Sequence, residues 1–334
     1  MTTPYSLDNA IDTFFSEYTT VSRQQCDAFV KFRVGGGQVQ AVQIQGYFSY
    51  TVVAAENNKI FQFRVHDSQL DMAIVTQAKL VHPQFVPSCI YLGAMGESRP
   101  VHIYEMDNVQ GTTYILARDN SIPQPPDAVL RQGNTVKDFA RFFAQSWMGA
   151  QHVQTSHHDA TASLSEFKHK IQLLSQSLPQ RYAHGLAKVS QHLPSLFSGA
   201  LPFVLTHGDL CEMNILIHPD TGNITGIVDW AEATILPFGF ALWSLENLFG
   251  FMDSKGWHYF DNRRELEGLF WRTFMLEARA VSDEQLRLIR LARMAGLFCR
   301  YGLIVDGKAM KGMVGPSDLS SIGYLDAFCL GNEF

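Results

Sequence analysis

The 334-residue chain is poor in the residues that define several common classes of protein. It has five cysteines, widely separated and without a Cys-x-x-Cys pair. A disulfide framework and a zinc site built on paired cysteines are therefore not expected. Its apolar runs are short, and none reaches the roughly 18 residues of a membrane-spanning helix. No association with a membrane is predicted.

Charge is also scarce. Charged residues make up 17% of the chain and the formal net charge is −6. Lys and Arg form no cluster, so a nucleic acid partner is not expected. The N-terminal segment has neither the basic start nor the apolar centre of a secretory leader, and this favours a cytoplasmic location.

The sequence lacks several catalytic signatures as well. It contains no Gly-x-Ser-x-Gly elbow, no His-Glu-x-x-His motif and no dinucleotide-binding fingerprint with its acid. No internal repeat is evident. The length and the 46% content of hydrophobic residues predict a globular protein of about two domains.

The most informative stretch covers residues 203–232, where two apolar runs each end at polar side chains. The first run ends at His207, and Asp209 and Asn214 follow it, while the second run ends at Asp229. A single Asp or Asn in a loop is typical of a turn or a helix cap. Three such residues at fixed offsets beside two apolar runs favour a functional site.

A hairpin would bring these polar residues together. The segments ILIHP (215–219) and ITGIVD (224–229) predict two short strands, and DTGN (220–223) predicts the turn between them. In an antiparallel pair of this length the end of the second strand returns to the start of the first. We therefore expect Asp229 to lie near Asn214.

The chemistry of phosphate transfer requires side chains of these types. An acid must orient or deprotonate the attacking hydroxyl, and oxygen ligands must hold the Mg²⁺ that neutralises the phosphates. Asp209 is suited to the first role, and Asn214 and Asp229 to the second. Loss of Asp209 is then expected to reduce turnover more than nucleotide affinity.

The same residues resemble the kinase superfamily, in which His-x-Asp-Leu is followed by Asn five residues after the Asp. Gly208 and the pair Asp229-Trp230 resemble more closely the aminoglycoside phosphotransferase and choline kinase-like family. The longer string HGDLCEMNIL…GIVDWAEA is similar to a version widespread in fungi. The resemblance implies a bilobal α+β fold like that of protein kinases. It also implies ATP and Mg²⁺ as cofactors, and a small-molecule hydroxyl as the phosphate acceptor.

The resemblance also implies two domains. Residues 1–106 would form a nucleotide-binding lobe and residues 107–334 a helical lobe with the catalytic loop. In the first lobe the sequence patterns predict helices near 6–18, 22–32 and 69–81 and strands at 39–45, 50–56, 59–65, 82–93 and 101–106. In the second lobe apolar stripes predict helices within 135–152, 164–178, 181–193, 239–252, 263–281 and 283–305. The segment 119–128 is predicted to be a loop, and the tail 306–334 a loosely packed end.

Further nucleotide contacts follow from the resemblance. The loop from Gly46 to Ser49 would cover the phosphates, Arg64 would grip the phosphates that are not transferred, and Met106 would contact adenine. Asp71, at the start of the next helix, is either the acid partner of Arg64 or an acid that satisfies the helix end. The two alternatives are both open at this point.

Three departures from the family pattern favour a rival interpretation. Arg64 replaces the usual Lys, the phosphate loop has one Gly, and Phe240 stands where related families carry an acid that braces the catalytic loop. The alternative is a protein that binds a nucleotide or metabolite without transferring phosphate, or that uses the fold for other chemistry. A protein kinase is a weaker alternative, because no Ala-Pro-Glu motif follows Asp229.

The acceptor pocket is expected beyond Asp229. Trp230, Glu232 and Glu246 are the candidates for its wall, and acids there would suit an amine-bearing small molecule.

Overall fold

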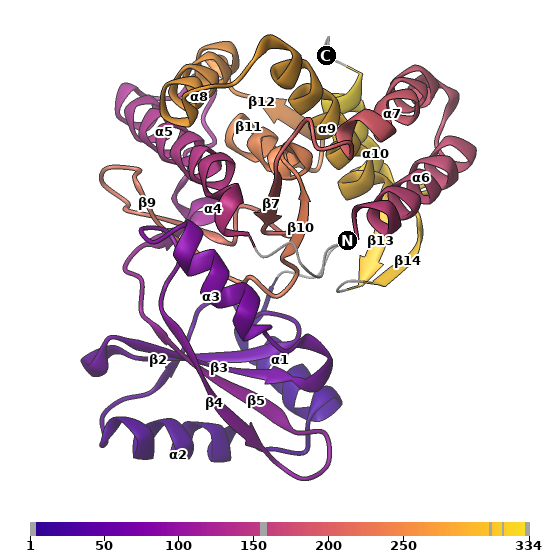
Figure 1. The fold of residues 1–334 in the computed structure, drawn as a ribbon. Helices are drawn as coiled ribbons and strands as arrows, with labels where there is room; N and C mark the ends of the chain where they lie inside the picture. Colours follow the sequence, from indigo (N-terminus) through magenta and orange to yellow (C-terminus); the bar gives the residue numbers. More distant parts are fainter. Residues whose placement is uncertain (1–4, 154–158, 307–308, 316, 331–334) are drawn as a thin grey trace. The chain divides into compact units, whose positions relative to one another are not determined.

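The computed structural model describes residues 5–153, 159–306, 309–315 and 317–330. The chain divides into two compact units, Met1–Lys79 with Val86–Gln110, and Leu80–Phe85 with Gly111–Phe334 (Figure 1). The first unit contains a five-stranded antiparallel sheet and the second is mainly helical. The α+β class predicted from the sequence is confirmed.

The sheet of the first unit has the strand order β1-β2-β3-β5-β4, and every neighbouring pair is antiparallel. Its strands are β1 (Gln40–Ala41), β2 (Ser49–Ala54), β3 (Lys59–Val65), β4 (Cys89–Met95) and β5 (Val101–Asp107). The helices are α1 (Leu7–Thr13), which continues into a π-helical turn (Phe14–Tyr18), α2 (Arg23–Val34) and α3 (Met72–Val81). Short 3₁₀ turns lie at Ala55–Asn57 and His66–Ser68.

Local capping signals set the ends of the first two helices. The Ser6 hydroxyl accepts a hydrogen bond from the backbone N–H of Asn9. Ser22 and Gln25 form a reciprocal capping box at the start of α2, and Gly35 ends that helix with φ 79°. These helix starts follow from the sequence because each depends on hydrogen bonds between neighbouring residues.

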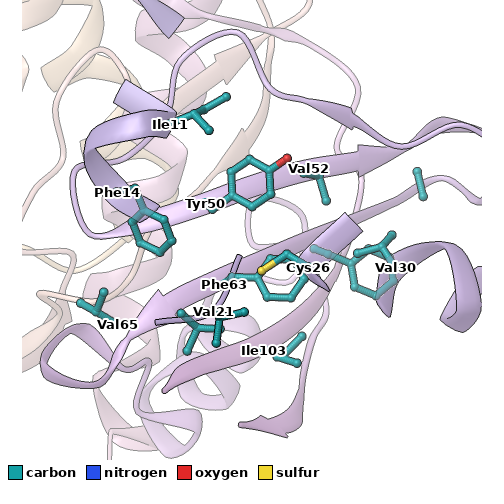
Figure 2. Close-up of a cluster of buried hydrophobic side chains, with 13 residues drawn as sticks. Ile11, Phe14, Val21, Cys26, Val30, Tyr50, Val52, Phe63, Val65 and Ile103 are labelled. Carbon is teal, nitrogen blue, oxygen red and sulfur yellow. The ribbon is translucent and has the colours of Figure 1, made fainter. Parts of the chain in front are cut away.

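The core of this unit lies between the leading helices and the sheet. Figure 2 shows side chains from both gathered into one apolar cluster. Alternate residues of β3 contribute to it, since Phe61 and Phe63 are fully buried in the cluster and Val65 is nearly so. Burial of one such phenylalanine stabilises the fold by about 1.5–3 kcal/mol.

Two predicted strands are shorter than expected, for identifiable reasons. The strand expected at 39–45 ends after Ala41, because the Gln45 side chain accepts from the N–H of Thr51 at 2.7 Å and donates to its carbonyl at 2.9 Å. The Gln45 side chain thus makes the two hydrogen bonds to Thr51 that the backbone of a neighbouring strand would make. The strand expected at 82–93 begins at Cys89, after two prolines that offer no N–H to a ladder.

The second unit contains the remaining elements. Its helices are α4 (Tyr114–Ala117), α5 (Pro126–Met148), α6 (Ala160–Ser177), α7 (Ala183–Leu196), α8 (Arg263–Ala278), α9 (Asp283–Gly302) and α10 (Leu319–Cys329), with 3₁₀ segments at Gly149–His152, Gln180–Tyr182 and η6 (Phe240–Leu248). Its strands are β6 (Thr112–Thr113), β7 (Phe203–Thr206), β8 (Ile215–Ile217), β9 (Ile224–Ile227), β10 (Thr234–Pro237), β11 (Gly250–Asp253), β12 (Gly256–Tyr259), β13 (Leu303–Asp306) and β14 (Ala309–Met313). They form the antiparallel groups β6-β8-β9, β10-β7, β11-β12 and β13-β14.

Three expectations for this unit were wrong. Helix α5 begins at Pro126, inside the predicted loop, because proline is favourable in the first helical turn. The segment 239–252 forms the 3₁₀ helix η6 and then β11, rather than an α-helix. The tail is not loose: β14 and α10 lie within it, and α10 buries Ile322, Leu325 and Phe328 at a spacing of three.

No helix in the described part of the chain is both long and apolar enough to cross a membrane.

The turn of the β8–β9 hairpin is fixed to helix α5. The Thr135 hydroxyl donates to the carbonyl of Gly222 at 2.6 Å. The Asp138 carboxylate accepts from the Asn223 side chain at 2.9 Å and from the N–H of Ile224 at 3.0 Å. A Cβ at Gly222 would lie 2.2 Å from the carbonyl oxygen of Arg131 on the same helix. The hairpin therefore sits in a defined position on the second unit.

This close approach predicts that Gly222→Ala destabilises the protein more than Gly199→Ala. Both glycines have positive φ, 73° and 90°, but a Cβ at Gly199 would meet nothing within 4 Å. Both changes should cost about 1–2 kcal/mol for the left-handed backbone, and Gly222→Ala a further 1–3 kcal/mol, roughly, for the clash. Urea unfolding of the two variants measures the difference. Equal losses would show that the hairpin does not depend on the contact with α5.

A buried histidine predicts how stability changes with pH. Burial lowers the pKa of His82 from 6.5 to about 3, despite a hydrogen bond to Gln145 and with a small further decrease from His207. The unfolded chain takes up a proton at this residue below pH 6.5, whereas the folded protein does not. This contribution to stability is therefore complete above that pH and is lost as the pH falls toward the folded pKa.

We expect the free energy of unfolding to fall by about 2 kcal/mol through His82 between neutral pH and about pH 5. His82→Gln should make the slope of unfolding free energy against pH shallower, as measured by urea unfolding at several pH values. The same change at the exposed His169 is the control for the loss of a histidine. An unchanged slope in His82→Gln would contradict the prediction.

Candidate active site

The β8–β9 hairpin brings the predicted metal ligands to one place. Ile215 is opposite Ile227 in its antiparallel register, and the N–H of Val228 donates to the carbonyl of Asn214 at 3.0 Å. This bond extends the ladder by one position beyond each strand. Asn214 and Asp229 therefore lie at the same end of the hairpin, as the spacing of the two apolar runs predicted.

Asp209 is held at both carboxylate oxygens. Arg300 donates to Oδ1 at 2.7 Å, and the side-chain amide of Asn214 donates to Oδ2 at 3.2 Å and to the Asp209 carbonyl at 2.7 Å. Because the side-chain nitrogen of Asn214 donates to Asp209, the side-chain oxygen of Asn214 points away from Asp209. The loop between β7 and β8, predicted to be catalytic, thus presents one carboxylate and one amide oxygen in fixed orientations.

Asp229 has an unusual backbone conformation. Its φ is 63°, in the left-handed region that residues other than glycine seldom occupy. Such conformations cost about 1–3 kcal/mol and concentrate at functional sites. The strain at Asp229 marks this end of the hairpin as a site where the direction of a side chain matters.

His207 connects the catalytic loop to the segment that carries Asp229. It is buried, and its Nε2 lies 2.8 Å from the carbonyl oxygen of Val228. A carbonyl can only accept, so Nε2 carries the proton and donates. Burial lowers the pKa of His207, although Val228, Asp209 and Asp229 oppose this, so the ring is neutral at physiological pH. His207 therefore acts as a structural connection.

Gly208 permits a close approach of two segments. With φ 82°, it places its Cα so that a Cβ would lie 2.2 Å from the carbonyl oxygen of Glu232. Any larger residue would push the catalytic loop away from the segment after Asp229. This explains physically why the chain has glycine where protein kinases usually have arginine.

Two residues predicted to line the acceptor pocket are parts of the core instead. Trp230 is buried, donates its indole N–H to the carbonyl of Ile227 at 3.1 Å and packs on His207. Glu246 is fully buried and pairs with Arg293 at 2.5 Å. Neither is placed to contact a substrate, because each is enclosed by protein groups. Glu232 is half-buried beside Gly208.

Arg300 was missed by the sequence analysis. It lies in the last turn of α9, 91 residues after Asp209, and its guanidinium carbon is 4.6 Å from the ring centroid of Trp243. Burial tends to lower the pKa of Arg300, but neighbouring groups led by Asp209 raise it overall. No motif identifies such a residue, because the contact joins two distant segments.

The cation predicted to grip the phosphates, Arg64, is on β3 and buried. Its guanidinium donates to the carbonyl of Ser68 at 2.5 Å, to the Ser68 hydroxyl at 2.7 Å and to the side chain of Gln62 at 3.0 Å. Asp71 accepts from the N–H groups of Ala73 and Ile74 at the start of α3. The structure therefore supports the helix-capping interpretation of Asp71 rather than its pairing with Arg64.

The other predicted nucleotide contacts also belong to the first unit. Ser49 opens β2, where its N–H donates to the carbonyl of Gly46 at 3.4 Å and its hydroxyl accepts from Gln62 at 3.3 Å. Met106 lies within β5, opposite Ile60 on one side and Cys89 on the other. An adenine contact through the Met106 backbone is unsuitable, because its polar groups face neighbouring strands.

The donor set near Asp209 fits a magnesium ion that is also bound by phosphate oxygens. Among the described residues, no group of three His, Cys, Asp or Glu side chains could hold a metal ion alone. Asn214 and Asp229 offer hard oxygen ligands, and Mg²⁺ is commonly bound by one or two side chains together with substrate phosphates.

A comparison with known protein families gives a match. Residues 72–259, more than half of the chain, match the family described as phosphotransferase enzyme family (APH). No curated protein matches the chain in sequence.

Several solved structures have a similar fold. An aminoglycoside phosphotransferase from Streptomyces rimosus is 14% identical, with 80% of this chain and 97% of that chain covered and a TM-score of 0.46. A macrolide 2'-phosphotransferase from Brachybacterium faecium is 12% identical, with 83% and 91% covered and a TM-score of 0.49. An ethanolamine kinase from Plasmodium vivax is 13% identical, with 89% and 86% covered and a TM-score of 0.48.

The match over residues 72–259 includes the catalytic loop, the β8–β9 hairpin and Asp229. The chain therefore belongs to the phosphotransferase enzyme family, as the resemblance of its catalytic loop predicted.

Proposed function

We propose that the protein transfers the γ-phosphate of ATP to a hydroxyl group of a small molecule. The observation that carries this proposal is the convergence of Asp209, Asn214 and Asp229 at one end of the β8–β9 hairpin. The membership of the protein in the phosphotransferase family supports the same reaction class.

Asp209 is the proposed catalytic residue. The acceptor hydroxyl would donate its hydrogen bond to the carboxylate, and the proton would pass to Asp209 as the oxygen bonds to the γ-phosphorus. The bond from the γ-phosphorus to the bridging oxygen breaks, and ADP leaves. The interactions of Asp209 with Arg300 and Asn214 support this role, since they fix the carboxylate before the acceptor arrives.

Asn214 and Asp229 are the proposed ligands of Mg²⁺. When bound, the ion supplies positive charge that offsets the charge of the phosphate groups. The Asn214 amide is already oriented by Asp209, so its oxygen needs no rearrangement to coordinate.

In the first unit, Arg64 is proposed to contact the phosphates that are not transferred, and the turn from Gly46 to Ser49 to cover them. Ser68 and Gln62 hold the guanidinium of Arg64 in one orientation, which favours binding of a planar fork to phosphate oxygens. Adenine is proposed to bind to the backbone after β5 rather than to Met106.

The acceptor is proposed only as a small molecule with a free hydroxyl. The argument for an amine-bearing acceptor depended on acids near Asp229. Glu246 is paired to Arg293 inside the core, so Glu232 alone of those candidates is near the catalytic loop. Release of ADP in a screen of hydroxyl-bearing metabolites would identify the acceptor.

Binding of Mg·ATP tests the proposed metal site. It also distinguishes the proposed function from the alternatives that need no nucleotide. At about 100 times its dissociation constant, a ligand stabilises the fold by about 2.7 kcal/mol. We expect a clear rise in the melting temperature of the wild type with Mg·ATP, and little rise in Asp229→Asn, because the ion loses a carboxylate. ATP with a chelator is the control. An equal rise in both proteins would disprove the role of Asp229.

Turnover tests the proposed role of Asp209. Asp209→Asn keeps the size of the side chain but cannot accept a proton, so the rate of phosphate transfer should fall by about 10²–10⁴-fold. Its thermal shift with Mg·ATP should stay close to that of the wild type. If the variant retains nearly full turnover with the identified acceptor, Asp209 is not the catalytic residue. If the wild type binds Mg·ATP but releases no ADP with any acceptor, the protein is a binding protein.

A further inference from the structure

The catalytic aspartate is in contact with the C-terminal end of a helix far along the chain. Arg300, in the last turn of α9, donates to Asp209 Oδ1 at 2.7 Å. Its guanidinium also lies over the ring of Trp243, with its carbon 4.6 Å from the ring centroid. The planar guanidinium of Arg300 thus makes both contacts at once.

The residue at the position of the usual brace cannot hold Asp209. Phe240 is buried, and its ring packs on those of Phe167 and Phe197 at centroid distances of 4.7 and 5.5 Å. It has no polar atom in its side chain. The catalytic loop therefore requires another group to fix its carboxylate.

The packing of α9 on the 3₁₀ helix η6 supplies that group. A Cβ at Gly296 would lie 2.0 Å from the carbonyl oxygen of Phe240, so the two backbones are in direct contact there. Arg300 is four residues after Gly296 and shares its helix face. Trp243 is three residues after Phe240, one turn along a 3₁₀ helix. The contact that begins at Gly296 and Phe240 thus continues at Arg300 and Trp243.

We propose that Arg300 is the positioning residue for Asp209 and replaces the acid that is absent at position 240. Arg300 donates to Oδ1 of Asp209, and the Asn214 side-chain amide donates to Oδ2. Together they define the direction in which the carboxylate faces an incoming hydroxyl. This inference rests on the proposed function of Asp209 as the catalytic residue.

The ion pair is suited to orienting a side chain rather than to stabilising the fold. The side chains of Arg300 and Asp209 are 28% and 31% exposed. Ion pairs that are open to solvent to this degree add little to stability. A misplaced catalytic group, in contrast, can reduce a rate by about 100-fold. Loss of Arg300 should therefore be seen in turnover more than in unfolding.

The test compares Arg300→Met and Arg300→Lys with a matched control. Arg181 also pairs with an aspartate, Asp326, at 2.6 Å and lies over an aromatic ring, Tyr182, at 4.9 Å. It joins α10 to the segment before α7, and its partner has no proposed catalytic role. Arg181→Met therefore removes the same kinds of contact from a different place.

We expect Arg300→Met to lower kcat by about 10–100-fold with KM for ATP changed by less than about threefold. Arg300→Lys should recover part of the rate, because it retains the charge. Arg181→Met should stay within about twofold of the wild type, as expected for an exposed ion pair. Melting temperatures show whether each variant is folded. If Arg300→Met keeps the kcat of the wild type, the proposal is overturned.

A double-mutant cycle separates positioning from a general structural effect. In the Asp209→Asn background, Arg300→Met should cause no further loss of the residual ADP release, because its target is already absent. Additive losses would show that Arg300 acts by another route.

Crystal structures of the wild type and Arg300→Met provide a readout that does not depend on activity. The Asp209 carboxylate should leave its wild-type rotamer in the variant. If the rotamer and the Asn214 contact both persist without Arg300, the inference fails, whatever the reaction is. If the wild type neither binds Mg·ATP nor releases ADP, the proposed function fails, while the rotamer comparison still decides the role of Arg300.

Discussion

The candidate site depends first on the register of one short antiparallel hairpin. Ile215 is opposite Ile227, and the next position pairs Asn214 with Val228. Asp229 therefore follows at the same end of the hairpin as Asn214. A shift by one residue would turn the side chains of one strand to the other face and separate the two oxygen ligands. The turn is held by Thr135 and Asp138 of α5, so the register is fixed by packing as well as by strand pairing.

The second requirement is that the catalytic loop stays close to this hairpin. His207 bonds to the carbonyl of Val228, and Gly208 allows the backbone of Glu232 to approach. These two contacts place the loop on one side of the segment that carries Asp229. Trp230 supports His207, since its ring packs on the imidazole and its indole N–H donates to the backbone carbonyl of Ile227. A neutral histidine and an aromatic ring thus support two carboxylates, Asp209 and Asp229, that are partly or fully open to solvent.

Sequence alone was sufficient for those features that arise from neighbouring residues. The hairpin followed from two apolar runs and a turn, and the helices predicted to start near residues 22 and 283 do start there, at the caps Ser22 and Ser282. The roles of Glu246 and Trp230 were not predictable, because a polar or aromatic side chain in a sequence does not show whether it faces solvent. Arg293 pairs with Glu246 across 47 residues, and such partners are set by how helices pack. The structure of the tail was hidden for a similar reason. Helix α10 is held by rings such as those of Trp257 and Tyr301, which lie far from it in the chain.

The direct backbone contact of α9 with η6 has a consequence for how relatives of this chain can be recognised. In this chain Phe240 stands at the position of the acid, and Arg300, near the end of a later helix and one turn after Gly296, contacts Asp209. A search pattern that demands the acid would miss this chain, in which Arg300 contacts Asp209 instead. A pattern built on Gly296, Arg300 and Trp243 would instead find chains in which an arginine contacts this aspartate. It would separate them from chains that carry the acid.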